Sequence, residues 1–290
     1  MTDTAPELLI DGKEDGALSA RDRGLAFGDG VFETMAVVNG SVRFAGRHLA
    51  RLADGCERLG FEAPPEDTLQ ADIARVAAGQ QQTVVKLIVT RGTGGVGYAP
   101  PADARPVRIV QRLDWPNRAP SDYADGLRVG LCRCRVSRQP ALAGLKHLNR
   151  LEQVLARAEM ARLGLAEGLM LDDRDHVIEA TAGNVFASIN GELVTPRLDL
   201  SGVRGVMRAV VLATARDLGI AVRRSRLELP ALLEAKEVFL TNALAGLLPV
   251  REVVAGSFST SWAPGPMAAA LSRALIKEGV KPCGPEGGVA

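Results

Sequence analysis

The stretch that decides the interpretation of this 290-residue chain is LAGLKHLNRLEQ, residues 142–153. Its Lys146 is noticeable because lysines are rare here and nearly all basic residues are arginines. Apolar positions at helical spacing after it predict a helix to about residue 163, and they are Leu148, Leu151, Leu155, Ala158 and Leu163. A helix start and leucine neighbours both disfavour a charged amine, and covalent catalysis by lysine requires a neutral one. A lysine that extends from a helix end into solvent is the simpler alternative.

Composition and charge exclude several functional classes. Hydrophobic residues make up 47% and charged residues 24%, which is typical of globular domains. The net charge of +1 argues against a dedicated nucleic-acid or membrane-surface binder. The start of the chain lacks the basic and apolar regions of a signal peptide, and no stretch approaches the ~20 apolar residues of a membrane span. We therefore expect a soluble, cytoplasmic protein.

The hydrophobic pattern and the positions of prolines and glycines divide the chain into two expected domains of mixed α/β (α+β) class. Residues 1–113 read as a small α+β domain, with an Asn39-Gly40 hairpin and helices over about 46–59 and 66–78. Residues 114–126 contain two prolines and little apolar content, so we expect an interdomain linker. Residues 127–290 form a larger domain that carries Lys146, with a disordered tail after Lys281.

Three further features could bind an anion or a heterocycle. Residues 201–205, Ser-Gly-Val-Arg-Gly, precede a predicted helix and would expose backbone N–H groups suited to phosphate. Asn242-Ala243 follows a strand, and Arg51 could supply a bidentate countercharge. Glu179 ends another strand and could hold a protonated ring nitrogen. Taken singly, these are more often a helix cap, a turn and an exposed glutamate.

Other chemistries have little support in the sequence. The four cysteines, Cys56, Cys132, Cys134 and Cys283, are too scattered for a disulfide framework or a zinc site, and we expect no metal. No serine lies in a nucleophile-elbow pattern and the three histidines share no spacing, so a Ser-His-Asp hydrolase is disfavoured. The glycine loop, residues 91–98, reads as flexible and opens no helix, unlike a dinucleotide fingerprint.

Seven segments occur together, in order, in one known arrangement. They are residues 22–34 (DRGLAFGDGVFET), 48–52 (HLARL), 90–95 (TRGTGG), 142–153, 195–199 (TPRLD), 202–208 (GVRGVMR) and 241–244 (TNAL). With them the chain resembles the fold-type IV pyridoxal-phosphate enzymes, which have a D-amino-acid-aminotransferase-like fold. Within that family it is most similar to the 4-amino-4-deoxychorismate lyases, and the run KHLNRLEQ, residues 146–153, is the lyase-like part.

The resemblance implies a role for each candidate residue. Lys146 would carry pyridoxal 5'-phosphate covalently and act as the catalytic base, and Glu179 would pair with the ring nitrogen, supported by Asn184. Arg51 would bind the phosphate together with the N–H groups of Val203 and Arg204 and with Asn242-Ala243. Phe32 and Tyr98 would lie on the substrate side. The resemblance also implies a cofactor between the two domains and a homodimer whose partner loops border the site.

The implied activity is conversion of 4-amino-4-deoxychorismate to pyruvate and 4-aminobenzoate, a folate precursor. One departure stands out, since Val96 occupies a position where related enzymes often carry a carboxylate-binding arginine. Arg91, Arg138 and Arg150 are the replacements that the sequence offers, without an order among them. A transaminase of D-amino acids, branched-chain amino acids or amines is the alternative, and a catalytically silent cofactor-binding protein is a third.

Overall fold

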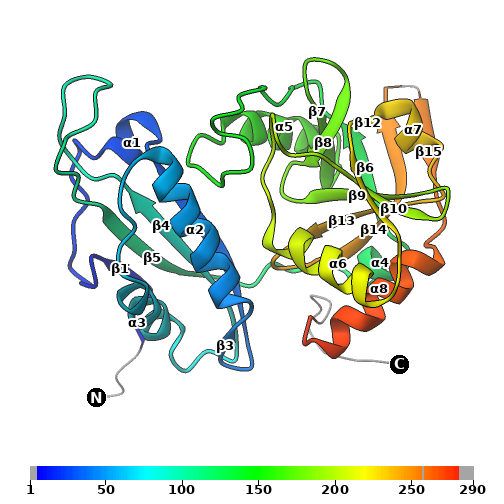
Figure 1. The fold of residues 1–290 in the computed structure, drawn as a ribbon. Helices are drawn as coiled ribbons and strands as arrows, with labels where there is room; N and C mark the ends of the chain where they lie inside the picture. Colours follow the sequence, from blue (N-terminus) through cyan, green and yellow to red (C-terminus); the bar gives the residue numbers. More distant parts are fainter. Residues whose placement is uncertain (1–4, 257, 281–290) are drawn as a thin grey trace. The chain divides into compact units, whose positions relative to one another are not determined.

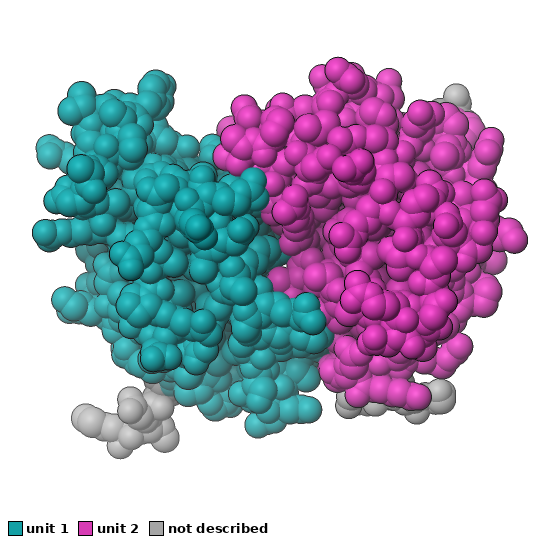
Figure 2. Space-filling model, viewed as in Figure 1, with its two compact units in different colours: residues 1–115, 145–149 teal, residues 116–144, 150–290 magenta. Residues whose placement is uncertain are grey.

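The computed structural model describes residues 5–256 and 258–280, and it divides the chain into two compact units (Figures 1 and 2). Unit 1 comprises Met1–Trp115 together with Leu145–Asn149, and unit 2 comprises Pro116–Gly144 and Arg150–Ala290. Cys283 and the tail after Lys281 lie outside the described residues. None of the described helices is long and apolar enough to cross a membrane.

The division differs from the sequence-based domain boundaries in two respects. The first segment of unit 1 ends at Trp115 rather than at residue 113, and the expected linker contains the short helix α4, Pro120–Ala124, which belongs to unit 2. Residues 145–149 belong to unit 1, so Lys146 does not lie in the C-terminal domain as the sequence suggested. The reason is a backbone pairing described below, which sequence patterns do not reveal.

Unit 1 is built on a five-stranded antiparallel sheet in the order β1-β5-β4-β2-β3. Its strands are β1 (Leu8–Ile10), β2 (Gly30–Val38), β3 (Ser41–Val42), β4 (Gln82–Thr90) and β5 (Val107–Leu113). The expected hairpin at Asn39-Gly40 joins β2 to β3, and both turn residues have positive φ.

Helices α2 (Ala45–Leu59) and α3 (Glu66–Ala77) cover one face of this sheet. Leu49, Leu52 and Cys56 on α2 are buried at helical spacing against Val31, Met35 and Val37 of β2. The third helix, α1 (Arg23–Phe27), is a single turn that precedes β2.

Alternation along β2 separates two chemical environments. The odd-numbered residues, among them Glu33, lie on the buried face below α2. The even-numbered Phe32 and Thr34 lie on the opposite face and are half-buried. Residues 145–149 run alongside the start of β2, because Phe32 N–H donates to the Lys146 carbonyl at 2.9 Å and Leu148 N–H donates to the Gly30 carbonyl at 3.0 Å.

Unit 2 contains a ten-stranded mixed sheet in the order β11-β10-β9-β13-β14-β6-β7-β8-β12, with β15 paired to β14. Its strands are β6 (Leu127–Leu131), β7 (Glu167–Leu171), β8 (His176–Ala180), β9 (Asn184–Ile189), β10 (Glu192–Pro196), β11 (Val222–Ser225), β12 (Leu227–Glu228), β13 (Glu237–Asn242), β14 (Gly246–Ala255) and β15 (Phe258–Ser261). Val194 of β10 and Val177 of β8 share one apolar core although their strands stand far apart in this order. The sheet therefore curls around that core.

Four further helices surround this sheet. They are α5 (Leu151–Arg162), α6 (Val206–Asp217), α7 (Leu229–Leu233) and α8 (Pro266–Lys277). Helices α6 and α8 lie side by side and pack on β13 (Figure 1). The mixed α/β class expected from the sequence is confirmed.

Helix α5 differs from its prediction in both start and orientation. It begins at Leu151, because residues 146–148 use their backbone to pair with β2. Its buried residues are Ala156, Glu159 and Met160, whereas Leu151 and Leu155 are 75% and 60% exposed. Gly130 and Gly168 leave room on the sheet for the Met160 side chain, so this face packs inward and the leucine stripe faces outward.

Candidate active site

Lys146 is held by the start of β2. Its carbonyl accepts from the Phe32 N–H, and its Nζ lies 4.2 Å from the centroid of the Phe32 ring. Lys86, on the neighbouring strand β4, places its Nζ 5.6 Å from the same centroid. The structure thus brings together two predicted site residues, Lys146 and Phe32, on the half-buried face of the unit 1 sheet. Lys146 does not sit at a helix start, so the expected effect of a helix end on its amine is absent.

Arg51 lies on α2 with its guanidinium fixed by Glu33. Arg51 Nε donates to Glu33 Oε1 at 2.7 Å, and Arg51 Nη2 donates to Glu33 Oε2 at 2.5 Å. His48, one helical turn before Arg51, places Nδ1 2.6 Å from Glu33 Oε2. Burial raises the pKa of the Glu33 carboxyl, but hydrogen bonds from His48 and Arg51 outweigh it and the pKa is lowered. Glu33 is therefore a buried carboxylate that orients Arg51.

Tyr98 lies in the glycine loop, where its side chain is 86% exposed. Its ring packs against Phe27 of α1, with centroids 5.3 Å apart. Val96, at the position where the resemblance leads us to expect an arginine, is equally exposed in the same loop. Both belong to unit 1, together with Arg51, Lys146 and Phe32.

In unit 2, Glu179 is a buried carboxylate between two donors. Gln153 Nε2 of α5 donates to Glu179 Oε1 at 3.2 Å, and Val203 N–H donates to Glu179 Oε2 at 2.7 Å. Only 4% of Glu179 is exposed, so it is not the exposed strand-end glutamate of the simpler alternative. Two acceptor oxygens held in this way give the carboxylate a fixed orientation.

The turn before α6 is organised by Asn184, the first residue of β9. Asn184 Nδ2 donates to the Val203 carbonyl at 2.8 Å, and Gly205 N–H donates to Asn184 Oδ1 at 3.1 Å. Arg204 N–H donates to the Gly144 carbonyl at 3.1 Å. The expectation that this turn exposes open N–H donors is therefore wrong for this arrangement, since the three amides already have acceptors. The phosphate role of Val203 and Arg204 stays a prediction.

Asn242 and Ala243 form the turn between β13 and β14. Asn242 Oδ1 accepts from the N–H groups of Leu244 and Ala245, which fixes this turn. Thr241, just before it, pairs with Asn184 across β13 and β9, so their side chains share one face. The turn at Asn242 therefore lies beside the turn before α6 within unit 2.

The three candidate replacements for the missing arginine differ in their surroundings. Arg91 donates through Nε to Asp29 at 2.7 Å and also to the Leu59 and Gly60 carbonyls, so it has a structural role in unit 1. Arg138 lies 3.8 Å from Asp172 and 3.6 Å from Asp173. Burial lowers the pKa of Arg150, while the charge of Glu179 raises it. Arg150 is thus the candidate beside a predicted cofactor residue.

Sequence reasoning missed Glu33, His48 and Gln153. The signal for the first two was available, because Glu33 is an odd-numbered residue of a strand whose odd positions are apolar, and His48 and Arg51 share a helix face. A charge on a buried strand face needs a partner. Gln153 lay within the lyase-like run, but its contact with Glu179 could not be inferred, because the helix that holds it was predicted with the wrong face buried.

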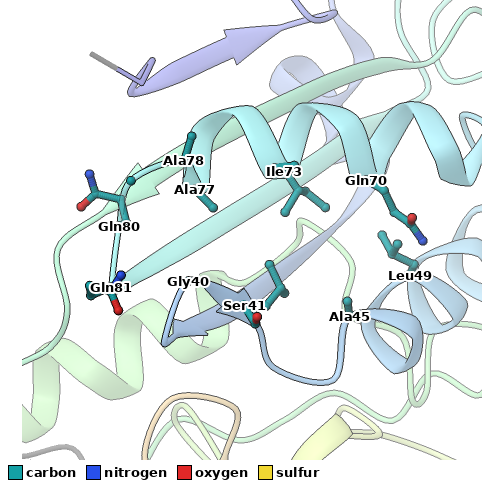
Figure 3. Close-up of a pocket in the computed structure, with 13 residues that line it drawn as sticks. Gly40, Ser41, Ala45, Leu49, Gln70, Ile73, Ala77, Ala78, Gln80 and Gln81 are labelled. Carbon is teal, nitrogen blue, oxygen red and sulfur yellow. The ribbon is translucent and has the colours of Figure 1, made fainter. Parts of the chain in front are cut away.

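A separate cavity of about 450 Å³ lies in unit 1 between the β2–β3 hairpin, α2 and α3 (Figure 3). Apolar and amide side chains line it, among them Leu49, Ile73 and Gln70, and no charged residue does. It contains none of the predicted site residues. Within residues 5–256 and 258–280, no cluster of three or more His, Cys, Asp or Glu residues could hold a metal ion.

Comparison with known proteins identifies the family. The amino-transferase class IV family model matches residues 30–253, which is more than half of the chain. The chain is 34% identical over 234 residues to the aminodeoxychorismate lyase of Vibrio harveyi, covering 81% of this chain and 86% of that protein. It is 28% identical over 251 residues to the branched-chain-amino-acid aminotransferase of Escherichia coli, covering 83% and 81%.

A solved structure agrees with these relatives. The crystal structure of 4-amino-4-deoxychorismate lyase from Pseudomonas aeruginosa superposes with a TM-score of 0.88 at 43% identity, covering 94% of this chain and 99% of that one. The resemblance inferred from the seven segments is confirmed. The chain belongs to the amino-transferase class IV family, the fold-type IV enzymes that depend on pyridoxal phosphate.

Proposed function

We propose that this protein is a pyridoxal-phosphate-dependent lyase that converts 4-amino-4-deoxychorismate to 4-aminobenzoate and pyruvate. The observation that carries the proposal is the course of the chain around Lys146. Gly144 makes two backbone hydrogen bonds with the turn before α6. Its N–H donates to the Gly202 carbonyl at 2.7 Å, and its carbonyl accepts from the Arg204 N–H. Chain connectivity keeps the Lys146 Cα within about 7.6 Å of the Gly144 Cα.

The residues present fit the parts of the cofactor. An amine at Lys146, a buried carboxylate at Glu179 and a guanidinium at Arg51 match an aldehyde, a ring nitrogen and a phosphate in turn. Helix α6 begins without a side-chain cap, and the buried hydroxyls of Ser201 and Thr241 have no partner among the described residues. Both hydroxyls adjoin the turns expected to bind phosphate, which supports an anionic group there.

Binding and orientation follow from these roles. Arg51, oriented by Glu33, would hold the phosphate together with the turn before α6 and Asn242-Ala243. The N–H groups of Val203 and Arg204 would have to exchange their present acceptors for phosphate oxygens. Glu179, fixed by Gln153, would keep a proton on the ring nitrogen, with Asn184 maintaining the neighbouring turn. Bound pyridoxal phosphate supplies an electron sink.

Proton transfer is the task of Lys146. Its Nζ would accept the proton from the substrate carbon that bears the amino group. The adjacent carbon–oxygen bond then breaks, the ring becomes aromatic, and the enolpyruvyl group leaves. That proton goes to the methylene carbon of the leaving group, which gives pyruvate and balances the reaction. Since aromatisation is strongly favourable, the residues need chiefly to position the groups and to move one proton.

Arg150 bears on substrate recognition. Arg150 is half-buried and feels the charge of Glu179, so we propose it as the ligand for a substrate carboxylate in place of an arginine at position 96. Phe32, beside Lys146, would contact the substrate ring, and Tyr98 would border the substrate.

Transamination is the second candidate, and the 28% identity to the branched-chain-amino-acid aminotransferase supports it. The same lysine would then return the proton to the cofactor rather than assist elimination. The lyase relatives are more similar, at 34% and 43% identity, which favours elimination.

A coupled assay tests the proposal. Purified protein loaded with pyridoxal phosphate receives 4-amino-4-deoxychorismate, and pyruvate and 4-aminobenzoate are measured together. Equal amounts of both products support the lyase. Keto-acid-dependent consumption of an amino donor, without pyruvate release, would favour the transaminase, and inactivity in both assays would favour a silent cofactor-binding protein.

We also propose a homodimer. Leu151, Val154 and Leu155 of α5 are 75%, 57% and 60% exposed, and apolar exposure on one helix is typical of an interface. Light scattering during gel filtration would report the mass. A monomer at micromolar concentration would contradict this proposal.

A further inference from the structure

Arg23 is a buried arginine whose side chain donates hydrogen bonds to several backbone carbonyls of the glycine loop. Its Nη1 donates to the carbonyls of Gly94, Gly97 and Ala99 at 3.3, 3.2 and 3.3 Å, and its Nη2 donates to the Tyr98 carbonyl at 2.9 Å. Its Nε donates to Asp29 Oδ2 at 2.9 Å. Only 5% of Arg23 is exposed. One guanidinium thus binds four carbonyls of a single loop.

The charge of Arg23 is balanced within the same cluster. Asp29 accepts from both Arg23 and Arg91, and Arg91 follows β4 at the base of the loop. Burial raises the pKa of Asp29, but the hydrogen bonds from Arg91 and Arg23 outweigh it and the pKa is lowered. The carboxylate therefore stays ionised and keeps Arg23 in place.

The backbone of the loop is rich in glycine, so its ordering costs more conformational entropy than usual. Gly92, Gly94, Gly95 and Gly97 all have positive φ, and glycine is the residue that loses most freedom on ordering. At Gly95 a side chain has no room, because a Cβ would lie 2.1 Å from the Ala99 carbonyl oxygen and 3.2 Å from Arg23 Nη1. The sequence predicts flexibility here, whereas the structure shows carbonyls converging on one cation.

The loop presents two side chains outward. Val96 and Tyr98 are each 86% exposed, while the carbonyls around them face Arg23. The Tyr98 ring is also fixed by Phe27, and the Arg23 guanidinium lies 5.0 Å from the Phe27 ring centroid. Arg23 therefore controls the position of both exposed side chains without being exposed itself.

We propose that Arg23 is a positioning residue for substrate recognition, which holds the glycine loop in one conformation and so fixes where Val96 and Tyr98 meet the substrate. This inference rests on the proposed function, in which Tyr98 borders the substrate. Because Arg23 is only 5% exposed, it would act through the loop and not by direct contact with the substrate. Lysine cannot replace it, since an ammonium has three donors on one atom whereas the guanidinium spreads five N–H groups over a fork.

The first experiment measures the loop without using activity. Chymotrypsin cleaves after aromatic residues, so cleavage at Tyr98 is identified by mass spectrometry of its two fragments, residues 1–98 and 99–290. Cleavage needs local opening of the loop. We expect Arg23→Met to be cleaved at Tyr98 at least about tenfold faster than the wild type, and Arg23→Lys at an intermediate rate. Arg21→Met, an exposed neighbour, is the matched control and should match the wild type.

The second experiment separates recognition from chemistry. In cofactor-loaded Arg23→Met, KM for the substrate should rise about tenfold or more, while the dissociation constant of pyridoxal phosphate stays within about twofold. If Arg23→Met fails to fold, Gly95→Ala gives the same test, because its methyl group displaces Ala99 and Arg23.

Two results would overturn the inference. One is cleavage at Tyr98 that is unchanged in folded Arg23→Met. The other is faster cleavage with an unchanged KM. A wild-type protein that binds pyridoxal phosphate but releases no pyruvate would contradict the proposed function alone. The role of Arg23 could then still be tested by cleavage at Tyr98 and by the KM for transamination.

Discussion

Glu33 and Arg51 form a side-on pair, with both carboxylate oxygens of Glu33 bonded to Nε and Nη2 of Arg51 at 2.7 and 2.5 Å. The pair connects a strand to a helix on the buried face of unit 1, where Glu33 is 1% exposed. His48 adds a third contact to the same carboxylate. A residue expected to bind phosphate is thus oriented by a buried acid that the sequence did not single out.

Replacing Glu33 by Gln should lower both stability and cofactor affinity. Breaking one side of a buried ion pair costs about 3 kcal/mol, and Arg51 loses its fixed orientation. Urea denaturation of the cofactor-free protein and titration with pyridoxal phosphate measure the two effects. Glu192→Gln is the control, because the Glu192–Arg223 pair is largely exposed and should contribute less than about 1 kcal/mol. Equal stabilities of the two variants would contradict the prediction.

The Glu33 pair should also make stability depend on pH. The pKa of Glu33 in the folded protein lies below its ordinary value of 4.5, so the carboxylate contributes stability that is fully present above that value. This stability is lost as the pH falls through the folded pKa. The Tm difference between wild type and Glu33→Gln should therefore be constant near neutral pH and shrink below about pH 4.5. A Tm difference between the two proteins that grows towards acid pH would contradict this prediction.

Lys146→Ala should abolish the absorbance band of the lysine-bound cofactor and reduce kcat by about 10³-fold or more, because the amine both attaches the cofactor and moves the proton. Lys86→Ala is the informative comparison. Its Nζ lies 5.6 Å from the centroid of the Phe32 ring that Lys146 also approaches, and the variant should keep the band. Loss of the band in Lys86→Ala alone would transfer the covalent role to Lys86.

Glu179→Gln should retain the band and lose about 10²- to 10⁴-fold in kcat. A neutral amide cannot keep a proton on the ring nitrogen, although it can still accept from Val203 N–H. Absorbance spectra and single-turnover kinetics separate cofactor binding from proton transfer. A kcat within about threefold of the wild type would remove Glu179 from this role.

Two glycines of α2 provide a test of packing in unit 1. Gly46→Ala should raise the free energy of unfolding by about 0.5 kcal/mol, since nothing lies within 4 Å of the added Cβ and alanine favours a helix. At Gly55 the Cβ would lie 2.9 Å from Val31 Cγ1, so Gly55→Ala should cost about 1–3 kcal/mol instead. Thermal melts of both variants check the opposite signs.

The sequence predicted much of this architecture, for reasons visible in particular residues. The Asn39-Gly40 turn and the spacing of Leu49, Leu52 and Cys56 are local signals, and both gave the correct element. The helix at 146 was placed five residues too early because pairing of residues 146–148 with β2 is a non-local event. The leucine stripe of α5 was read as buried, whereas Gly130 and Gly168 select the Met160 face.

Prediction of the candidate site met the same limit. Glu179, Asn184 and Val203 were named from separate segments, and the structure joins them through two hydrogen bonds. Which amides of that turn already had acceptors could not be deduced, because Gly144 and Asn184 are distant in sequence. Arg23 was quoted within a matching segment, but its function as a loop anchor depends on four carbonyls from elsewhere in the chain.

Residues 145–149 belong to unit 1, although the residues before and after them belong to unit 2. This crossing of the chain constrains how such a protein can be divided. A gene fragment encoding only residues 116–290 would carry Lys146 without the strand that holds its backbone. A fragment ending at residue 115 would retain that strand and lack the lysine. We therefore expect neither piece to keep this site as an autonomous module, and recombination that exchanges one half for that of a relative should preserve both crossing points.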